Sequence, residues 1–74
     1  MQRQPVESSN LKSVGFESYI DSAQGILEVE FKSGSVYQYF QVPEVIYHEL
    51  LNAESKGRYH YHNIRGEFDY ERIK

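Results

Sequence analysis

The chain has 74 residues, of which 39% are hydrophobic, 15% aromatic and 26% charged, and its formal net charge is −3. This length predicts one domain, and the aromatic content is not typical of a disordered chain. Cys is absent, which excludes disulfides and thiolate metal sites. The N-terminus is polar and no segment reaches the apolar length of a membrane span, so we expect a soluble cytoplasmic protein with no signal peptide and no membrane partner.

The first elements follow in chain order. Residues 1–10 are polar and predict a flexible lead-in, and the domain is expected to span residues 11–74. A first strand is expected over about residues 12–20, with Val14, Phe16 and Ile20 on one face. The clearest strand covers residues 26–31. Its apolar positions are expected to face inward (Leu27, Val29, Phe31) and its two glutamates outward (Glu28, Glu30).

The next loop decides where Tyr37 and Tyr39 point. Strand faces repeat every two residues, so a loop that is longer by one residue turns the following strand over. A two-residue loop at Ser33-Gly34 would place both tyrosines on the side of the glutamates. A three-residue loop over 32–34, with glycine in the left-handed region at its last position, pairs Val29 with Tyr37 instead. We favour the longer loop, because two-residue turns prefer Asn-Gly or Asp-Gly, and we therefore expect both tyrosines to join the apolar face.

A strand over about residues 35–40 is followed by a helix over about residues 43–55. Pro43 suits the first turn of a helix, and Glu44 suits the positive end of the helix dipole. Gly57 is expected to end the helix, with Lys56 in its last turn. Apolar residues at helical spacing form a stripe that is expected to pack on the sheet (Val42, Ile46, Leu50, Ala53).

The last part of the chain is expected to be irregular or a short helical turn over residues 58–66, and then a strand over 67–73 with Phe68 and Tyr70 on one parity. The predicted fold is therefore α+β. It is a three- to four-stranded antiparallel meander with one main helix packed on it.

Several short motifs occur in a fixed order. They are Ser8-Ser9 before Leu11, Val14-Gly15-Phe16, Leu27-x-Val29-x-Phe31, Gly34, Tyr37-x-Tyr39, Val42-Pro43, Leu50, Ala53-x-Ser55-x-Gly57 and Tyr61-x-Asn63-Ile64-Arg65. This ordered set resembles the KTSC domain, which occurs at the C-terminus of some lysyl-tRNA synthetases and as a free-standing small bacterial protein. The resemblance covers about residues 6–73. It implies no defined activity, and it suggests RNA binding only through the association with a synthetase. The two histidines at 60 and 62 depart from the family pattern.

No constellation in the chain predicts an enzyme. Without Cys there is no thiol nucleophile, and no nucleophile motif surrounds any Ser. His60 and His62 would lie on one side of an extended strand, but structural zinc sites usually include Cys. We therefore expect no catalytic residues, no metal site and no cofactor.

RNA is the first expected partner. Residues 56–74 hold five of the eight Lys and Arg residues but only three of the eleven acids. Cations and aromatic rings alternate there, as in segments that bind single-stranded RNA by stacking and phosphate contacts. The predicted RNA-binding residues are Arg58, Tyr59, His60, His62, Asn63 and Arg65.

Each part of this segment also has a purely structural interpretation. Tyr59 or Tyr61 could pack against the sheet with Ile64 as an anchor, while Arg65 pairs with Glu28 or Glu30. The Tyr-x-Tyr strand could be a stacking platform for bases or part of the core. The alternative function is a protein–protein interaction module, because a peptide can add a strand to a free sheet edge. Convergence of the basic residues on one face with exposed rings would favour RNA.

Overall fold

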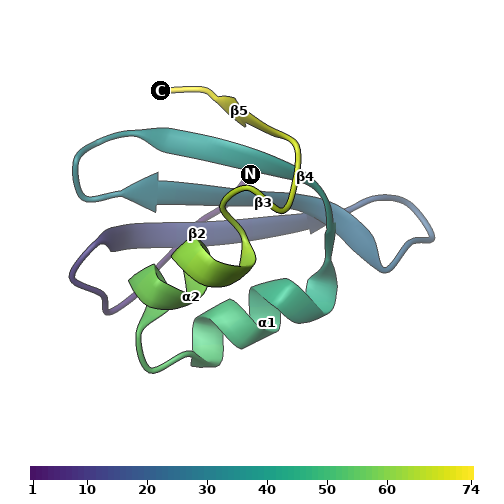
Figure 1. The fold of residues 1–74 in the computed structure, drawn as a ribbon. Coiled ribbons are helices and arrows are strands. Elements are labelled where there is room, and N and C mark those ends of the chain that lie inside the picture. Colours follow the sequence, from purple (N-terminus) through teal and green to yellow (C-terminus); the bar gives the residue numbers. More distant parts are fainter.

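The computed structural model describes residues 1–74 as a five-stranded antiparallel sheet with both helices on one face (Figure 1). The strands are β1 (Gln4–Pro5), β2 (Leu11–Ser18), β3 (Gln24–Phe31), β4 (Val36–Pro43) and β5 (Tyr70–Arg72). The helices are α1 (Glu44–Asn52) and α2 (Lys56–Asn63). The strand order in the sheet follows the chain order, so the predicted α+β meander is confirmed, with one more strand and one more helix than expected. Neither helix has the length and apolar character needed to cross a membrane.

The loop between β3 and β4 has the favoured three-residue form. The Phe31 amide donates to the Ser35 carbonyl at 2.9 Å, and Gly34 has a φ of +100°. Val29 lies opposite Tyr37 in the sheet, and both tyrosines share the apolar face. Tyr39 is 4% exposed and Tyr37 is half-buried, so the predicted register is confirmed.

Replacing Gly34 with valine is expected to lower the free energy of unfolding by about 1–3 kcal/mol. A Cβ atom at this position would meet no other atom within 4 Å, so the cost comes from the backbone conformation alone. Asparagine tolerates a positive φ better than a β-branched residue does, so Gly34→Asn is the matched control and should cost less. Urea denaturation of the three proteins provides the comparison, and a valine variant as stable as the asparagine variant would contradict this account.

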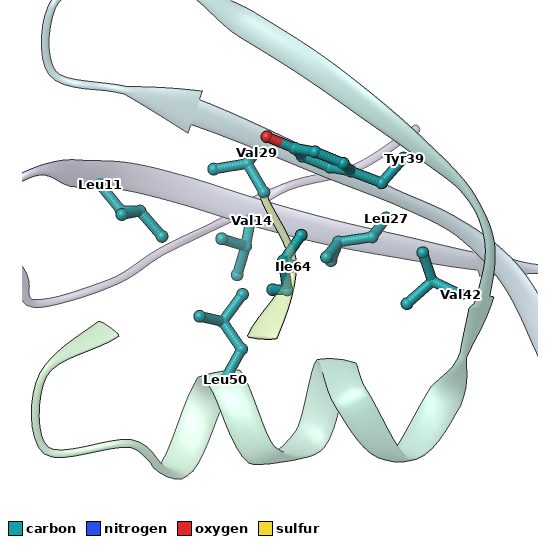
Figure 2. Packing of buried hydrophobic residues seen from close by; sticks show 8 residues of the cluster. All are labelled: Leu11, Val14, Leu27, Val29, Tyr39, Val42, Leu50 and Ile64. Carbon is teal, nitrogen blue, oxygen red and sulfur yellow. The ribbon is translucent and has the colours of Figure 1, made fainter. Parts of the chain in front are cut away.

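The hydrophobic core lies between the sheet and α1 (Figure 2). Its eight buried residues come from β2, β3, β4, α1 and the end of α2 (Leu11, Val14, Leu27, Val29, Tyr39, Val42, Leu50, Ile64). The expectation that Ile20 joins this face is wrong. Strand β2 ends at Ser18, and Ile20 lies in the following turn with 92% of its surface exposed. Alternation cannot extend past the point where strand pairing ends.

The prediction that Gly57 ends the first helix is also wrong. Helix α1 ends at Asn52, and Ala53 is extended with φ −69° and ψ 140°. A second helix then begins, because the Ser55 hydroxyl accepts a hydrogen bond from the Arg58 amide as an N-cap. Gly57 lies inside this helix, where an added Cβ would be 3.4 Å from the Asn10 side chain. The last strand is shorter than expected, covering residues 70–72 rather than 67–73.

Part of the N-terminal segment joins the sheet as β1. Gln4 lies opposite Val14, and Pro5 lies opposite Ser13. The predicted mobility of residues 1–10 stays a prediction, but the segment has defined contacts with the face of the sheet opposite the helices. There the Arg3 guanidinium donates to the Glu28 carboxylate at 2.7 Å.

In one alternative drawn from the sequence, Arg65 was the partner of Glu28 or Glu30. In the structure that partner is Arg3. Its guanidinium also lies 3.8 Å from Glu30. The hydroxyl of Ser13 donates to Glu30 at 2.7 Å, and this hydrogen bond lowers the pKa of the Glu30 carboxyl. The two glutamates are thus held on the face without helices, and Arg65 is left for another role.

Candidate functional site

Helix α2 separates the predicted RNA-binding residues. Neighbours two positions apart on a helix point to different sides, whereas on an extended strand they would share one side. His60 is accordingly 7% exposed, while His62 lies on the surface. The expectation of two histidine rings on one side is wrong, because the segment is helical.

Tyr59 connects the two helices. Its hydroxyl donates to Glu49 of α1 at 2.6 Å, and burial together with this glutamate raises the pKa of Tyr59 to about 12. The Asn63 side chain donates to the Tyr59 carbonyl at 3.2 Å within α2. Arg58, His62 and Asn63 are exposed. These contacts give Tyr59 a structural role.

The main hollow of the domain lies between the β3–β4 hairpin, α2 and the segment that leads into β5. We call it the aromatic cleft. Its volume is about 560 Å³, and it is lined by twelve residues (Asn10, Phe31, Ser33, Ser35, Tyr37, Tyr39, Gly57, His60, Tyr61, Arg65, Gly66, Tyr70). Six of these carry aromatic rings, none is acidic, and Arg65 is the only residue with a fixed charge. Of the six predicted site residues, only His60 and Arg65 line the cleft.

One wall of the aromatic cleft is a continuous set of rings on the sheet. Tyr37 lies at the centre, with its ring centroid 5.8 Å from Phe31 and 5.8 Å from Tyr70. Tyr70 lies opposite Tyr39 in the sheet, and their ring centroids are 6.1 Å apart. Tyr70 is 61% exposed, so this wall presents ring surface to solvent at its outer end.

The other wall is formed by Tyr61 of α2 and by Arg65. The Arg65 guanidinium lies over the Tyr61 ring, 5.3 Å from its centroid. Tyr61 is 59% exposed and does not pack against the sheet, whereas Tyr59 packs against the core and Ile64 is fully buried, as the structural interpretation of this segment expected. A cation held against an aromatic face in this way remains available to anionic groups from solvent.

The floor of the cleft holds a buried polar pair. The Tyr39 hydroxyl and the His60 Nε2 atom are 2.7 Å apart. Burial, and then the positive charge of Arg65, lowers the pKa of His60 to about 4, while burial raises the pKa of Tyr39 to about 12. Both groups are therefore neutral at pH 7, and the pair presents hydrogen-bonding groups without charge.

Sequence reasoning missed most of this cleft. Its serines and Asn10 come from loops far apart in the chain, and Tyr70 was expected only as a strand residue. The available signal was the parity of the hairpin, because Phe31, Tyr37 and Tyr39 share one face in the favoured register. The choice between core and platform for the Tyr-x-Tyr strand was also too simple, since Tyr39 is buried and still borders the cleft.

This antiparallel meander, with two helices on one face and a cleft beside the second helix, defines a small α+β domain. The chain belongs to the KTSC domain family, because the model of the KTSC domain matches residues 7–68. The resemblance seen in the sequence is confirmed.

Similar proteins include both long and short chains. A lysine–tRNA ligase of Trichormus variabilis is 45% identical over 67 residues, which make up 90% of this chain but 11% of the ligase. An uncharacterized protein of Stutzerimonas stutzeri is 46% identical over 59 residues, or 80% of this chain and 78% of that protein. The crystal structure of a KTSC domain protein from Yersinia pestis matches 99% of this chain and 97% of its own, with 38% identity and a TM-score of 0.85.

Proposed function

We propose that this domain is a non-enzymatic binding module for single-stranded RNA, and that the aromatic cleft is its binding site. One observation carries the proposal. On a chain with a net charge of −3, a cleft of about 560 Å³ is lined by six rings, one arginine and no acid. Rings that stack on bases and cations that meet phosphates are the two elements of single-strand recognition.

The division of charge between the two faces of the sheet supports this choice. Arg72 lies opposite Tyr37, so it shares the face of the aromatic cleft, whereas Glu71 lies opposite Gln38 on the other face. Glu28 is held on that other face by Arg3 and by Gln38. A phosphate that approaches the rings therefore meets arginines rather than carboxylates. The similarity to a lysine–tRNA ligase is consistent with a ligand that is RNA.

Binding to single-stranded RNA is expected to depend weakly on salt. With about two to four phosphates neutralised, the slope of log K against log salt should lie near −1.5 to −3, at roughly 0.7 per phosphate. Arg65→Gln should reduce the magnitude of this slope by about 0.7. Arg58→Gln is the matched control, since Arg58 is exposed but does not line the cleft. Fluorescence anisotropy of a labelled oligonucleotide and of a transfer RNA at several salt concentrations provides both slopes.

Removing the ring of Tyr61 should act differently from removing the charge of Arg65. Tyr61→Leu is expected to weaken RNA binding by about 1–3 kcal/mol with little change in the salt slope, because stacking releases no counterions. The fold should be kept, since Tyr61 is 59% exposed. Tyr19→Leu, at the far end of the β2–β3 hairpin, is a control ring outside the cleft. If both leucine variants bind RNA equally well, the cleft is not the site.

A second candidate function is protein interaction, and one observation favours it. Strand β5 is at one edge of the sheet, so no strand of the domain pairs with its outer side, where a peptide strand could be added. No binding of any RNA at low salt by the folded domain would refute the RNA proposal and leave this one.

A further inference from the structure

Of the two main hollows of this domain, the aromatic cleft is the one that suits a nucleotide. A second, more polar hollow of about 350 Å³ lies between β4, the start of β3 and the segment that leads into β5, and two of its six lining residues are Glu67 and Asp69. Carboxylates there would repel a phosphate. The aromatic cleft has no acid, and its volume of about 560 Å³ lies within the range of roughly 300–1,000 Å³ that small-ligand sites occupy.

The two walls of the cleft are separate ring surfaces. On the sheet side, Phe31, Tyr37, Tyr39 and Tyr70 contact one another through ring distances of 5.8 to 6.3 Å. Tyr61 instead has His62 as its ring neighbour, at 5.2 Å, and Arg65 over its face. Tyr61 and Tyr70 are more than half exposed and border the same opening. A base that enters the cleft would therefore have ring surface on two sides, from Tyr61 and from the rings of the sheet.

Hydrophobic packing alone does not explain why a polar pair, Tyr39 and His60, is buried at the floor of the cleft. Tyr39 and His60 are 4% and 7% exposed, and both line the cleft. Burying two polar side chains costs free energy that apolar side chains of similar size would not cost. A tyrosine hydroxyl has one proton and two lone pairs, so its bond with His60 leaves capacity for a further hydrogen bond. The floor can therefore meet the polar edge of a base.

We infer that the aromatic cleft holds one unstacked nucleotide, with its base between Tyr61 and the rings of the sheet, its edge against Tyr39 and His60, and its phosphate on Arg65. This inference rests on the proposed function, and it adds that the cleft itself takes one base of the strand, while the phosphates of the flanking nucleotides lie outside the cleft. The Arg65 guanidinium lies 5.3 Å from the centroid of the Tyr61 ring, and both residues line the cleft, so the cation is close to where a base would bring its phosphate. Charge-assisted contacts between arginine and phosphate are among the strongest available to a surface site.

The test uses the full chain with isotope-labelled histidines and follows the ring signals of His60 and His62 by NMR. The probes are the four nucleoside 5′-monophosphates, the corresponding nucleosides and inorganic phosphate. We expect at least one monophosphate to shift the His60 signals while those of His62, which lies on the surface of the same helix, stay in place. Arg65→Gln should raise the dissociation constant of that monophosphate by about ten-fold, toward that of the nucleoside. Arg58→Gln should leave it unchanged.

Two results would overturn the inference. Inorganic phosphate that shifts His60 as much as the monophosphates do would reduce the cleft to an anion site. Absence of any shift at about 10 mM monophosphate, which would saturate even a millimolar site, would exclude a one-nucleotide pocket. If RNA binding nevertheless responds to Arg65→Gln, the proposed function stands and only the inference fails. If mononucleotides bind at the cleft but no RNA does, the proposed function fails and the inference holds for free nucleotides.

Discussion

Replacing Leu50 with alanine is expected to lower the free energy of unfolding by about 2–5 kcal/mol. Leu50 is fully buried and is the one buried residue of α1. Its side chain points from the helix toward Val14 and Ile64 in the core (Figure 2). The truncation leaves a cavity where helix and sheet meet, and the total stability of a small domain is low.

Urea denaturation of Val45→Ala gives the matched control for this variant. Val45 lies on the same helix with 56% of its surface exposed, so its truncation should change the stability by less than about 0.5 kcal/mol. A loss below about 1 kcal/mol for Leu50→Ala would contradict the account of how α1 packs on the sheet.

Acidification from pH 6.5 to pH 4 is expected to destabilise the domain through His60. Its pKa falls from 6.5 in the unfolded chain to about 4 in the folded one. Between these values the unfolded chain binds a proton that the folded domain does not, so the stability is complete above pH 6.5 and is lost as the pH falls toward 4. Because the cleft admits solvent, we expect a loss on the order of 2 kcal/mol rather than the roughly 3.4 kcal/mol that the whole difference between the two pKa values would give.

The stability should be measured by urea denaturation between pH 6.5 and pH 5. In this range Glu30, whose pKa lies below its ordinary value of 4.5, stays ionised and does not contribute to the pH dependence. His60→Phe should flatten the dependence of stability on pH in this window, even though it leaves the Tyr39 hydroxyl without its partner. His62→Gln, which changes an exposed histidine on the same helix, should keep the dependence. An equal slope in the wild type and in His60→Phe would show that another group is responsible.

The parts of the fold that local chemistry decides were predictable from the sequence. A glycine at the third loop position determines the β3–β4 register, and that register places Tyr37 and Tyr39 on the helix side of the sheet. Helix α2 was expected only as an irregular stretch or a short helical turn, although Ser55 is a typical N-cap residue, because Gly57 gives a strong local signal for the end of a helix. A Cβ atom at position 57 would lie 3.4 Å from the Asn10 side chain, an ordinary contact distance, so the fold does not require glycine there. The local signal of Gly57 is therefore misleading.

The site was predictable only in part. Arg65 and His60 were predicted because they belong to the segment where cations and rings alternate. Their surroundings come from the loop after β3 and from β5, and only the fold brings these together. Tyr59 was given a stacking role because of its neighbours in sequence, whereas the helix directs it to Glu49. Alternation along a chain identifies candidate residues, but the helix period decides which of them share a surface.

The claim that the aromatic cleft binds RNA is tested most directly by titrating the ¹⁵N-labelled domain with a short single-stranded RNA and recording which backbone amide signals shift. The account predicts shifts around the cleft, in residues 31–39, 57–66 and 70, together with little change in β1 and along Glu28 and Glu30 on the opposite face. Shifts confined to that opposite face, or no shifts at low salt with the fold intact, would contradict it.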